Sequence, residues 1–284
     1  MFKKIFFVTA LLLASLLSAK PVVIASIAPV GYLAKAVGGD KIEVQSLAKG
    51  DVHSYEPKPN DMKAVAKARI FIAAGLEFEE AWIPRFKASA KNLVVVQSDA
   101  KIAKLKEERG EQAEHDEKHE AHADPHVWLN PMLAITMARN ISDALIDMDK
   151  ANKDFYLENF QKLMNDLLAF DESAKNELAG LKNRKFVVYH PAWGYFAAHY
   201  DLEQISIERS GKEPKIDEMA STVKMIKDEN IKVIFADPNR SQKSAQILAS
   251  QTGAKVELLD PLGYNLLENL KIAVGAIKDA NSPK

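Results

Sequence analysis

Short apolar runs alternate with helical patterns along most of the 284-residue chain, and this alternation limits the possible folds more than any other feature. The apolar runs have the length and the β-branched content of buried strands, and segments with a helical apolar face separate most of them. They lie at residues 21–25, 42–47, 70–74, 93–97, 186–189, 204–207, 233–236 and 256–259. Because strands that alternate with helices pair in parallel, the sequence predicts an α/β fold of two similar lobes, each a mainly parallel sheet with flanking helices.

One long helix is predicted between the two groups of strands. Residues 150–181 contain no proline, and their first glycine is Gly180. From Phe160 to Leu181, apolar residues recur every three or four positions and mark a single apolar face. Such a helix is a rod of about 45 Å. Two interpretations stay open: a helix of a bundle, or a rigid linker that crosses the whole molecule and limits hinge motion between the lobes.

The first 19 residues have the layout of a secretory signal peptide. Lys3 and Lys4 give a positive start, residues 5–17 are almost entirely apolar, and small residues end the segment at Ala19. An uncleaved anchor is the alternative. The resulting organisation is a signal peptide at 1–19, an N-terminal α/β lobe at 20–149, a linker helix at 150–181 and a C-terminal α/β lobe at 182–284.

Composition narrows the class of protein. The chain has no cysteine, so a disulfide and a lipid anchor on an N-terminal cysteine are both excluded. The formal net charge of −1 does not indicate a protein that binds nucleic acid. We expect a monomer that is free in the periplasm after the signal is cleaved.

An acidic segment at 107–124 shows no apolar pattern and is predicted to be an exposed loop inserted in the N-terminal lobe. It carries eight acidic residues and three histidines, His115, His119 and His122. Two interpretations stay open: an accessory loop that collects metal and passes it on, or a solvated insertion with no role.

Three further histidines lie on connections at the ends of predicted elements. His53 follows a strand, His126 precedes a helix, and His190 lies between a strand and a helix. A rigid scaffold can direct such loop residues into a cleft. Imidazoles from separate loops, with no thiolate available, suit Zn²⁺ in a tetrahedral site. Isolated histidines that are simply packed or solvated remain the alternative.

A fourth ligand is less clearly marked. Asp260 and Asp237 each follow a predicted strand and precede a proline. We choose Asp260 as the fourth ligand and Asp237 as a reserve that could orient a ligand histidine. An Asx-turn or a helix cap would explain both aspartates equally well, and the fourth position could hold water or nothing.

The motifs around these residues resemble the metal-binding proteins of bacterial zinc and manganese ABC importers. The most specific one is Asp-Pro-His-Val-Trp-Leu-Asn-Pro at 124–131. The others are His-Ser-Tyr-Glu-Pro at 53–57, His-Pro-Ala-Trp-Gly-Tyr-Phe at 190–196, Glu-Pro at 213–214 and Leu-Asp-Pro-Leu-Gly at 259–263. The resemblance covers essentially the whole mature chain and implies two lobes joined by one long helix, with the metal between them.

By motif position, the resemblance implies that His53, His126 and His190 are ligands and that Asp260 is the carboxylate ligand. Manganese-binding relatives often carry Glu at the third position, so His190 favours Zn²⁺. Val52 stands where some zinc binders have a carboxylate. The acidic loop is similar to that of the zinc-specific branch, but it has three histidines where that branch has a long histidine tract.

The resemblance implies a solute-binding protein that captures zinc as transported cargo and delivers it to a membrane ABC permease. Manganese or iron import is the first alternative. A zinc-dependent hydrolase and an adhesin with a structural metal are further alternatives. No His-Glu-x-x-His motif, Gly-x-Ser-x-Gly elbow or phosphate-binding glycine loop is present, so the sequence predicts no enzyme activity.

Overall fold

The structure is a computed structural model that describes residues 20–106, 123–208 and 216–281. The predicted signal peptide lies outside the described residues. So do His115, His119 and His122 of the acidic loop, of which only residues 123 and 124 are described. Among the described helices, none combines the length and apolar character that a bilayer-spanning segment requires.

The first half of the chain forms a sheet of four parallel strands in the order β2-β1-β3-β4. The strands are β1 (Val22–Ala25), β2 (Glu43–Ser46), β3 (Ile70–Ala73) and β4 (Val94–Gln97). The helices of this half are α1 (Ala28–Gly38), α2 (Pro59–Val65), α3 (Glu77–Ser89) and α4 (Pro131–Met148). Every residue of the central strand β3 is buried, as expected for a parallel strand covered on both faces.

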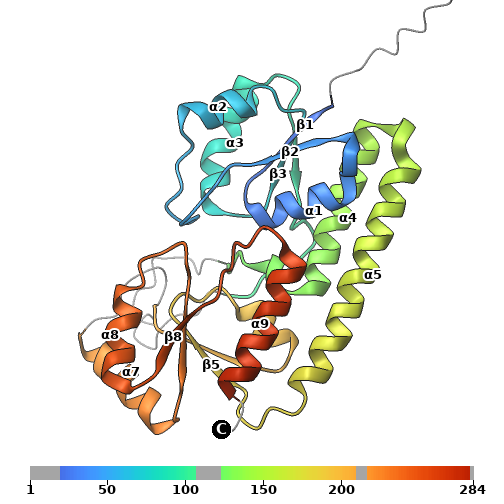
Figure 1. Cartoon of the computed structure of the whole chain (residues 1–284). Helices are drawn as coiled ribbons and strands as arrows, with labels where there is room; N and C mark the ends of the chain where they lie inside the picture. Colours follow the sequence, from blue (N-terminus) through green and yellow to red (C-terminus); the bar gives the residue numbers. More distant parts are fainter. Residues whose placement is uncertain (1–19, 107–122, 209–215, 282–284) are drawn as a thin grey trace, which may run out of the picture.

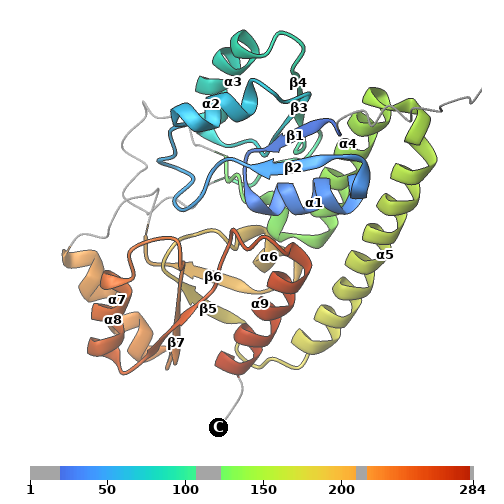
Figure 2. The same cartoon turned by 45° about the horizontal axis from the view of Figure 1, so that its top comes forward.

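The second half repeats this design with the strand order β6-β5-β7-β8, again fully parallel. Its strands are β5 (Lys185–Val188), β6 (Glu203–Ser206), β7 (Val233–Ala236) and β8 (Lys255–Leu258). Its helices are α6 (Gly194–His199), α7 (Ile216–Asp228), α8 (Lys243–Thr252) and α9 (Leu266–Asn281), all labelled in Figure 2. The predicted α/β class with two parallel sheets is therefore confirmed.

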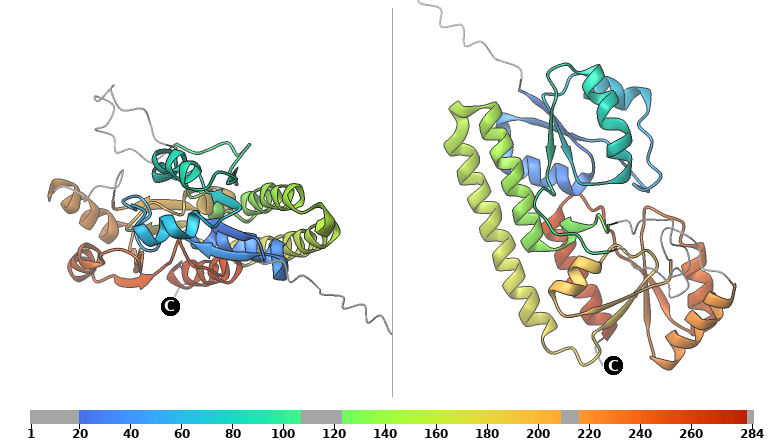
Figure 3. Two further views of the ribbon diagram at one scale, coloured as in Figure 1. Left: turned by 90° about the horizontal axis from the view of Figure 1, so that it is seen from above. Right: turned by 180° about the vertical axis from the view of Figure 1, so that it is seen from behind.

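The long helix α5 (Lys153–Leu178) runs beside both halves (Figures 1 and 3). A 3-10 turn at Lys150–Asn152 precedes it, so the helix begins three residues later than predicted. Its 26 residues give a length of about 39 Å, since each residue adds about 1.5 Å. Because α5 packs against α1 and α4 of the first half and α9 of the second, it acts as a brace between them. The rigid-linker interpretation therefore describes it better than the bundle interpretation.

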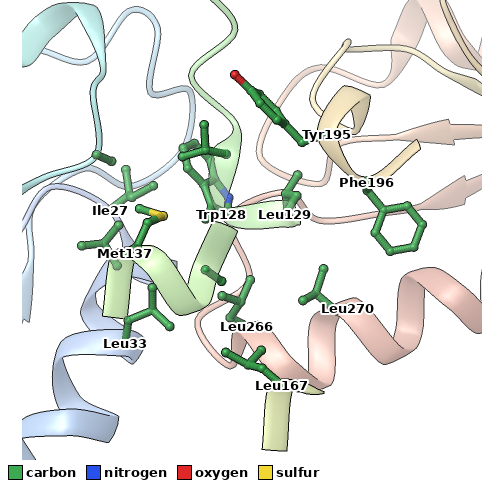
Figure 4. Close-up of a cluster of buried hydrophobic side chains, with 14 of the residues drawn as sticks. Ile27, Leu33, Trp128, Leu129, Met137, Leu167, Tyr195, Phe196, Leu266 and Leu270 are labelled. Atoms are coloured by element: carbon green, nitrogen blue, oxygen red, sulfur yellow. The ribbon is translucent and has the colours of Figure 1, made fainter. Parts of the chain in front are cut away.

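A single apolar core continues from one half into the other along this helix (Figure 4). Leu167 of α5 is fully buried in it, together with Leu266 and Leu270 of α9. Trp128 also lies in this core and donates a hydrogen bond from Nε1 to the carbonyl of Pro261, at 2.8 Å. A continuous core resists the opening of one half relative to the other, so the interface between them has a nearly fixed geometry.

Candidate metal centre

Three histidines from three separate segments meet between the two halves. His53, His126 and His190 each offer one ring nitrogen, and these atoms all lie within 4.8 Å of one another. The ring centroids form a nearly equilateral triangle, 5.4 Å from His53 to His126, 5.1 Å from His53 to His190 and 5.3 Å from His126 to His190. Nitrogens at this spacing can converge on one ion at the ~2.0–2.1 Å that zinc prefers.

His126 is held by the carboxylate two residues before it. Its Nδ1 lies 2.7 Å from Oδ1 of Asp124, and its backbone N–H donates to the same oxygen at 2.9 Å. Both side chains are almost completely buried. When Nδ1 carries the proton and donates a hydrogen bond to the carboxylate, the lone pair of Nε2 is available to a metal.

The rest of the 124–131 segment fixes the position of His126. The Trp128 ring lies 5.2 Å from the His126 ring and is anchored to Pro261 of the second half. Asn130 caps α4, because its side chain accepts hydrogen bonds from the first-turn N–H groups of Met132 and Leu133. This motif therefore combines a candidate metal ligand, its supporting carboxylate and the start of a helix.

His190 lies two residues beyond the end of β5, and a second carboxylate supports it. Its Nδ1 lies 2.9 Å from Oε2 of Glu208, and both side chains are buried. The sheet register explains the pairing: Val188 pairs with Ser206, so residues 190 and 208 leave the sheet side by side. The chain crosses from one side of β5 to the other between β6 and β7, so His190 lies at the topological switch point, where open α/β sheets bind ligands.

His53 is held more loosely, on the loop between β2 and α2. Its backbone N–H donates to Oδ1 of Asp51 at 3.2 Å. Its Nε2 is buried and has no hydrogen-bond partner among the described residues. A buried polar atom without a partner is costly in free energy, and a metal ion at the centre of the triangle would satisfy it.

Burial keeps the imidazoles of His53 and His190 in the neutral form that a metal needs. Burial, together with the neighbouring His126 and His190, lowers the pKa of His53 from 6.5 to about 3. Burial, His126 and the Arg240 guanidinium place the pKa of His190 well below its usual value. Protons therefore compete poorly with a metal for both ligands at neutral pH.

Arg240, in the connection between β7 and α8, adds a positive charge beside the triangle. Its Nη1 lies 2.6 Å from Oε2 of Glu208 and 2.6 Å from Nδ1 of His190. Its Nη2 lies 3.3 Å from Oδ2 of Asp51, in the first half. Arg240 thus joins the supports of two ligands across the interface.

Asp260 and Asp237 lie beside one another at the carboxyl edge of the second sheet. Asn239 donates from Nδ2 to both, at 2.7 Å to Asp260 and 3.0 Å to Asp237. Asp237 also lines a small cavity with His190, and burial raises its pKa. Neither carboxylate belongs to the group of ligand atoms that lie within 4.8 Å of one another, which consists of His53, His126 and His190. The Asx-turn interpretation applies to both, since Asp237 accepts from the N–H of Asn239 and Asp260 from that of Leu262.

Three functional residues were not predicted as such from the sequence: Asp124, Glu208 and Arg240. Asp124 had a local signal, because an aspartate two residues before a histidine can bond both its backbone and its ring. Glu208 and Arg240 had none, because the sheet register brings Glu208 to His190 and the turn after β7 brings Arg240 there. The halves also meet at Tyr195, whose hydroxyl donates to the Asp124 carbonyl and accepts from the Leu105 N–H, both at 2.8 Å.

Comparisons with known proteins assign the chain to a family. Residues 23–280 match the family model described as zinc-uptake complex component A, periplasmic. The chain is 30% identical over 279 residues to the high-affinity zinc uptake system protein ZnuA of Bacillus subtilis, covering 91% of this chain and 86% of that protein.

Solved structures give the same result. The chain resembles a crystal structure of ZnuA with a TM-score of 0.85 and 35% identity, covering 93% of this chain and 100% of that one. It also resembles a zinc-bound ZnuA that lacks residues 138–173 of its own numbering, with a TM-score of 0.86 and 34% identity. That match covers 93% of this chain and 99% of the other.

Proposed function

Because the chain belongs to the family of the periplasmic zinc-uptake component A, we propose that it captures zinc and delivers it to the permease of a membrane ABC importer. One observation carries the proposal: His53, His126 and His190 present three ligand atoms within 4.8 Å of one another. Zinc is the cargo of this protein and not a resident cofactor. The relatives named for zinc uptake support the same role.

The donor set favours zinc over manganese. Three neutral nitrogens suit Zn²⁺, whereas Mn²⁺ prefers oxygen-rich sites. The carboxylates nearest the triangle, Asp124 and Glu208, are directed at the Nδ1 atoms of two ligands, so they act through the imidazoles. This is the carboxylate–histidine arrangement common at zinc sites.

We propose Asp260 as the fourth ligand, with Asp237 beside it as a supporting carboxylate. The segment that carries Asp260 lies against the site, since Pro261 lines a cavity with His190 and accepts the hydrogen bond of Trp128. The hydrogen bonds that Asn239 and Leu262 donate to the Asp260 side chain both end on Oδ1. Oδ2 is therefore the oxygen that Asp260 would turn to zinc.

The remaining parts of the proposal concern place and partners. We place the protein in the periplasm as a soluble monomer, after cleavage of residues 1–19, without a lipid anchor because the chain has no cysteine. The permease is its proposed partner, and nucleic acid is not. His115, His119 and His122 are proposed to collect zinc weakly and pass it to the triangle, which their acidic surroundings would favour.

Competitive titration against a chromophoric chelator tests the proposal. The wild type should bind one zinc ion tightly and prefer it to manganese. A variant with alanine at positions 53, 126 and 190 should lose that binding. His199→Ala is the matched control, because His199 bonds Asp171 at 2.6 Å and is outside the triangle, so it should bind like the wild type. Equal binding by the triple variant would refute the site.

The alternatives make different predictions. A structural metal would leave the protein unfolded after chelation, whereas a carrier releases its cargo and keeps its circular dichroism spectrum. A zinc hydrolase would turn over ester substrates faster than free zinc does. Membership of a solute-binding transport family argues against catalysis.

A further inference from the structure

The contacts of Arg240 place a positive charge beside the proposed zinc ligands. Nη1 lies 2.6 Å from the Nδ1 atom of His190, a proposed ligand. Glu208 already supports the same nitrogen at 2.9 Å, so His190 would be oriented without Arg240. The guanidinium is mostly buried, with 17% of the side chain exposed, so solvent screens its charge only in part.

The charges around the triangle show what Arg240 changes. Asp260 is the proposed carboxylate ligand. Further negative charge near a bound Zn²⁺ comes from Asp51, Asp124 and Glu208, which form hydrogen bonds with the three histidines. Arg240 pairs with two of these three carboxylates, Glu208 at 2.6 Å and Asp51 at 3.3 Å. It thereby offsets part of the attraction that they would exert on a dication, and it repels the dication directly.

We propose that Arg240 sets how tightly zinc is held: its charge, fixed by Glu208 and Asp51, weakens zinc binding at the three-histidine site and speeds release. Arg240 is therefore a residue that acts through the ligands and their supports without touching the metal. The inference rests on the proposed function, because a carrier must give up its cargo to the importer. A site with three supporting carboxylates and no opposing cation would bind zinc more tightly and release it more slowly.

Three substitutions in the Arg240–Asp51 ion pair separate this charge effect from a structural one. Arg240→Gln keeps a hydrogen-bonding side chain and removes the charge, whereas Arg240→Lys keeps the charge. We expect Arg240→Gln to bind zinc at least about tenfold more tightly, with a matching fall in the release rate. Arg240→Lys should stay within about threefold of the wild type. Asp51→Asn should weaken binding, because it removes a negative charge and leaves Arg240 in place.

The measurements are the zinc dissociation constant by chelator competition and the release rate by stopped flow, on the full mature chain. Opposite signs for Arg240→Gln and Asp51→Asn support the proposal. If Arg240 served only to tie the two halves together, both substitutions would weaken binding, and that result would overturn it. Unchanged or weaker binding by folded Arg240→Gln would overturn it as well.

Removing Arg240 leaves Glu208 buried without its cation, so folding needs its own control. Circular dichroism of the metal-free variants checks it. If Arg240→Gln does not fold, the pair Glu208→Gln and Glu208→Gln/Arg240→Gln repeats the test, and the double variant should bind more tightly than the single one. A wild type that fails to bind zinc would instead refute the proposed function, so the two failures are distinguishable.

Discussion

The two halves of the molecule share one sheet design but present their histidines differently. In the second half, His190 lies two residues beyond β5, and the sheet itself places Glu208 beside it. In the first half, His53 lies seven residues beyond β2, on a loop, and His126 lies just before the 3-10 turn Val127–Leu129 that leads into α4. The same topology therefore supplies one ligand from a strand end and two from longer connections.

The supports of the ligands differ as well. His126 and His190 each have a buried carboxylate beside Nδ1. Asp51 instead accepts a hydrogen bond from the backbone N–H of His53. Two ligands are therefore fixed before zinc arrives, and His53 is the one with freedom to adjust. We infer that the fixed pair determines the position of the ion and that His53 closes the coordination from the loop.

The largest expected effect follows from removing a fixed ligand. His190→Ala should weaken zinc binding about a thousandfold, ~4 kcal/mol, because a ligand and its preorganised support are lost together. His53→Ala should cost less, since a water can replace a ligand that was not fixed in advance. Chelator competition measures both. Equal or greater loss in His53→Ala would break the distinction between fixed and adjustable ligands.

A second prediction tests whether the halves are thermodynamically separate. Leu167 of α5 is fully buried in the core that both halves share. Leu167→Ala should reduce the free energy of unfolding by about 2–5 kcal/mol, because it leaves a cavity. The protein should still unfold in one transition. The adjacent Leu168 is 40% exposed, so Leu168→Ala is the control and should change stability by less than about 0.5 kcal/mol. Two transitions in denaturant, with only one of them shifted, would show that the halves unfold independently.

These contrasts also explain how much of the fold was readable from the sequence. Buried parallel strands appear as continuous apolar runs, so β3 and β7 were marked locally, and the apolar stripe from Phe160 to Leu178 marked α5. The start of α5 was less clear, because the residues of the 3-10 turn before it are as polar as a helical first turn. Such boundaries depend on local hydrogen bonding that composition does not record.

The site was readable to the extent that its residues had local motifs. His53, His126 and His190 each stand in a motif, and the structure brings all three together. Glu208 and Arg240 stand in none, because their role comes from the register of β5 with β6 and from the turn after β7. Asp260 stays a prediction, since its carboxylate bonds Asn239 and is outside the histidine group.

A third prediction compares the supports of the fixed ligands. Asp124→Asn and Glu208→Gln should each weaken zinc binding about 10- to 100-fold, because the ring is then oriented less firmly and is a poorer donor. Asp171→Asn is the control, since Asp171 bonds His199 away from the triangle and should leave zinc binding unchanged. Measured by the same competition assay, wild-type affinity in both support variants would mean that packing alone orients His126 and His190.

The smallest expected effect concerns pH. The pKa of His53 is lowered to about 3 and that of His190 lies well below its usual value, so both are neutral in the folded, metal-free protein at pH 7. Zinc then displaces almost no protons from these two ligands, and their contribution to the pH dependence of affinity between pH 7.5 and 6.5 should be less than about twofold. Histidines with the ordinary value of about 6.5 would instead be half protonated at the lower limit and would release protons on binding. Titration calorimetry in buffers of different ionisation enthalpy measures that release directly. The variants His53→Ala and His190→Ala show which released protons come from these two ligands. If the two ligands together release a full proton or more at pH 6.5, the triangle is open to water before zinc arrives.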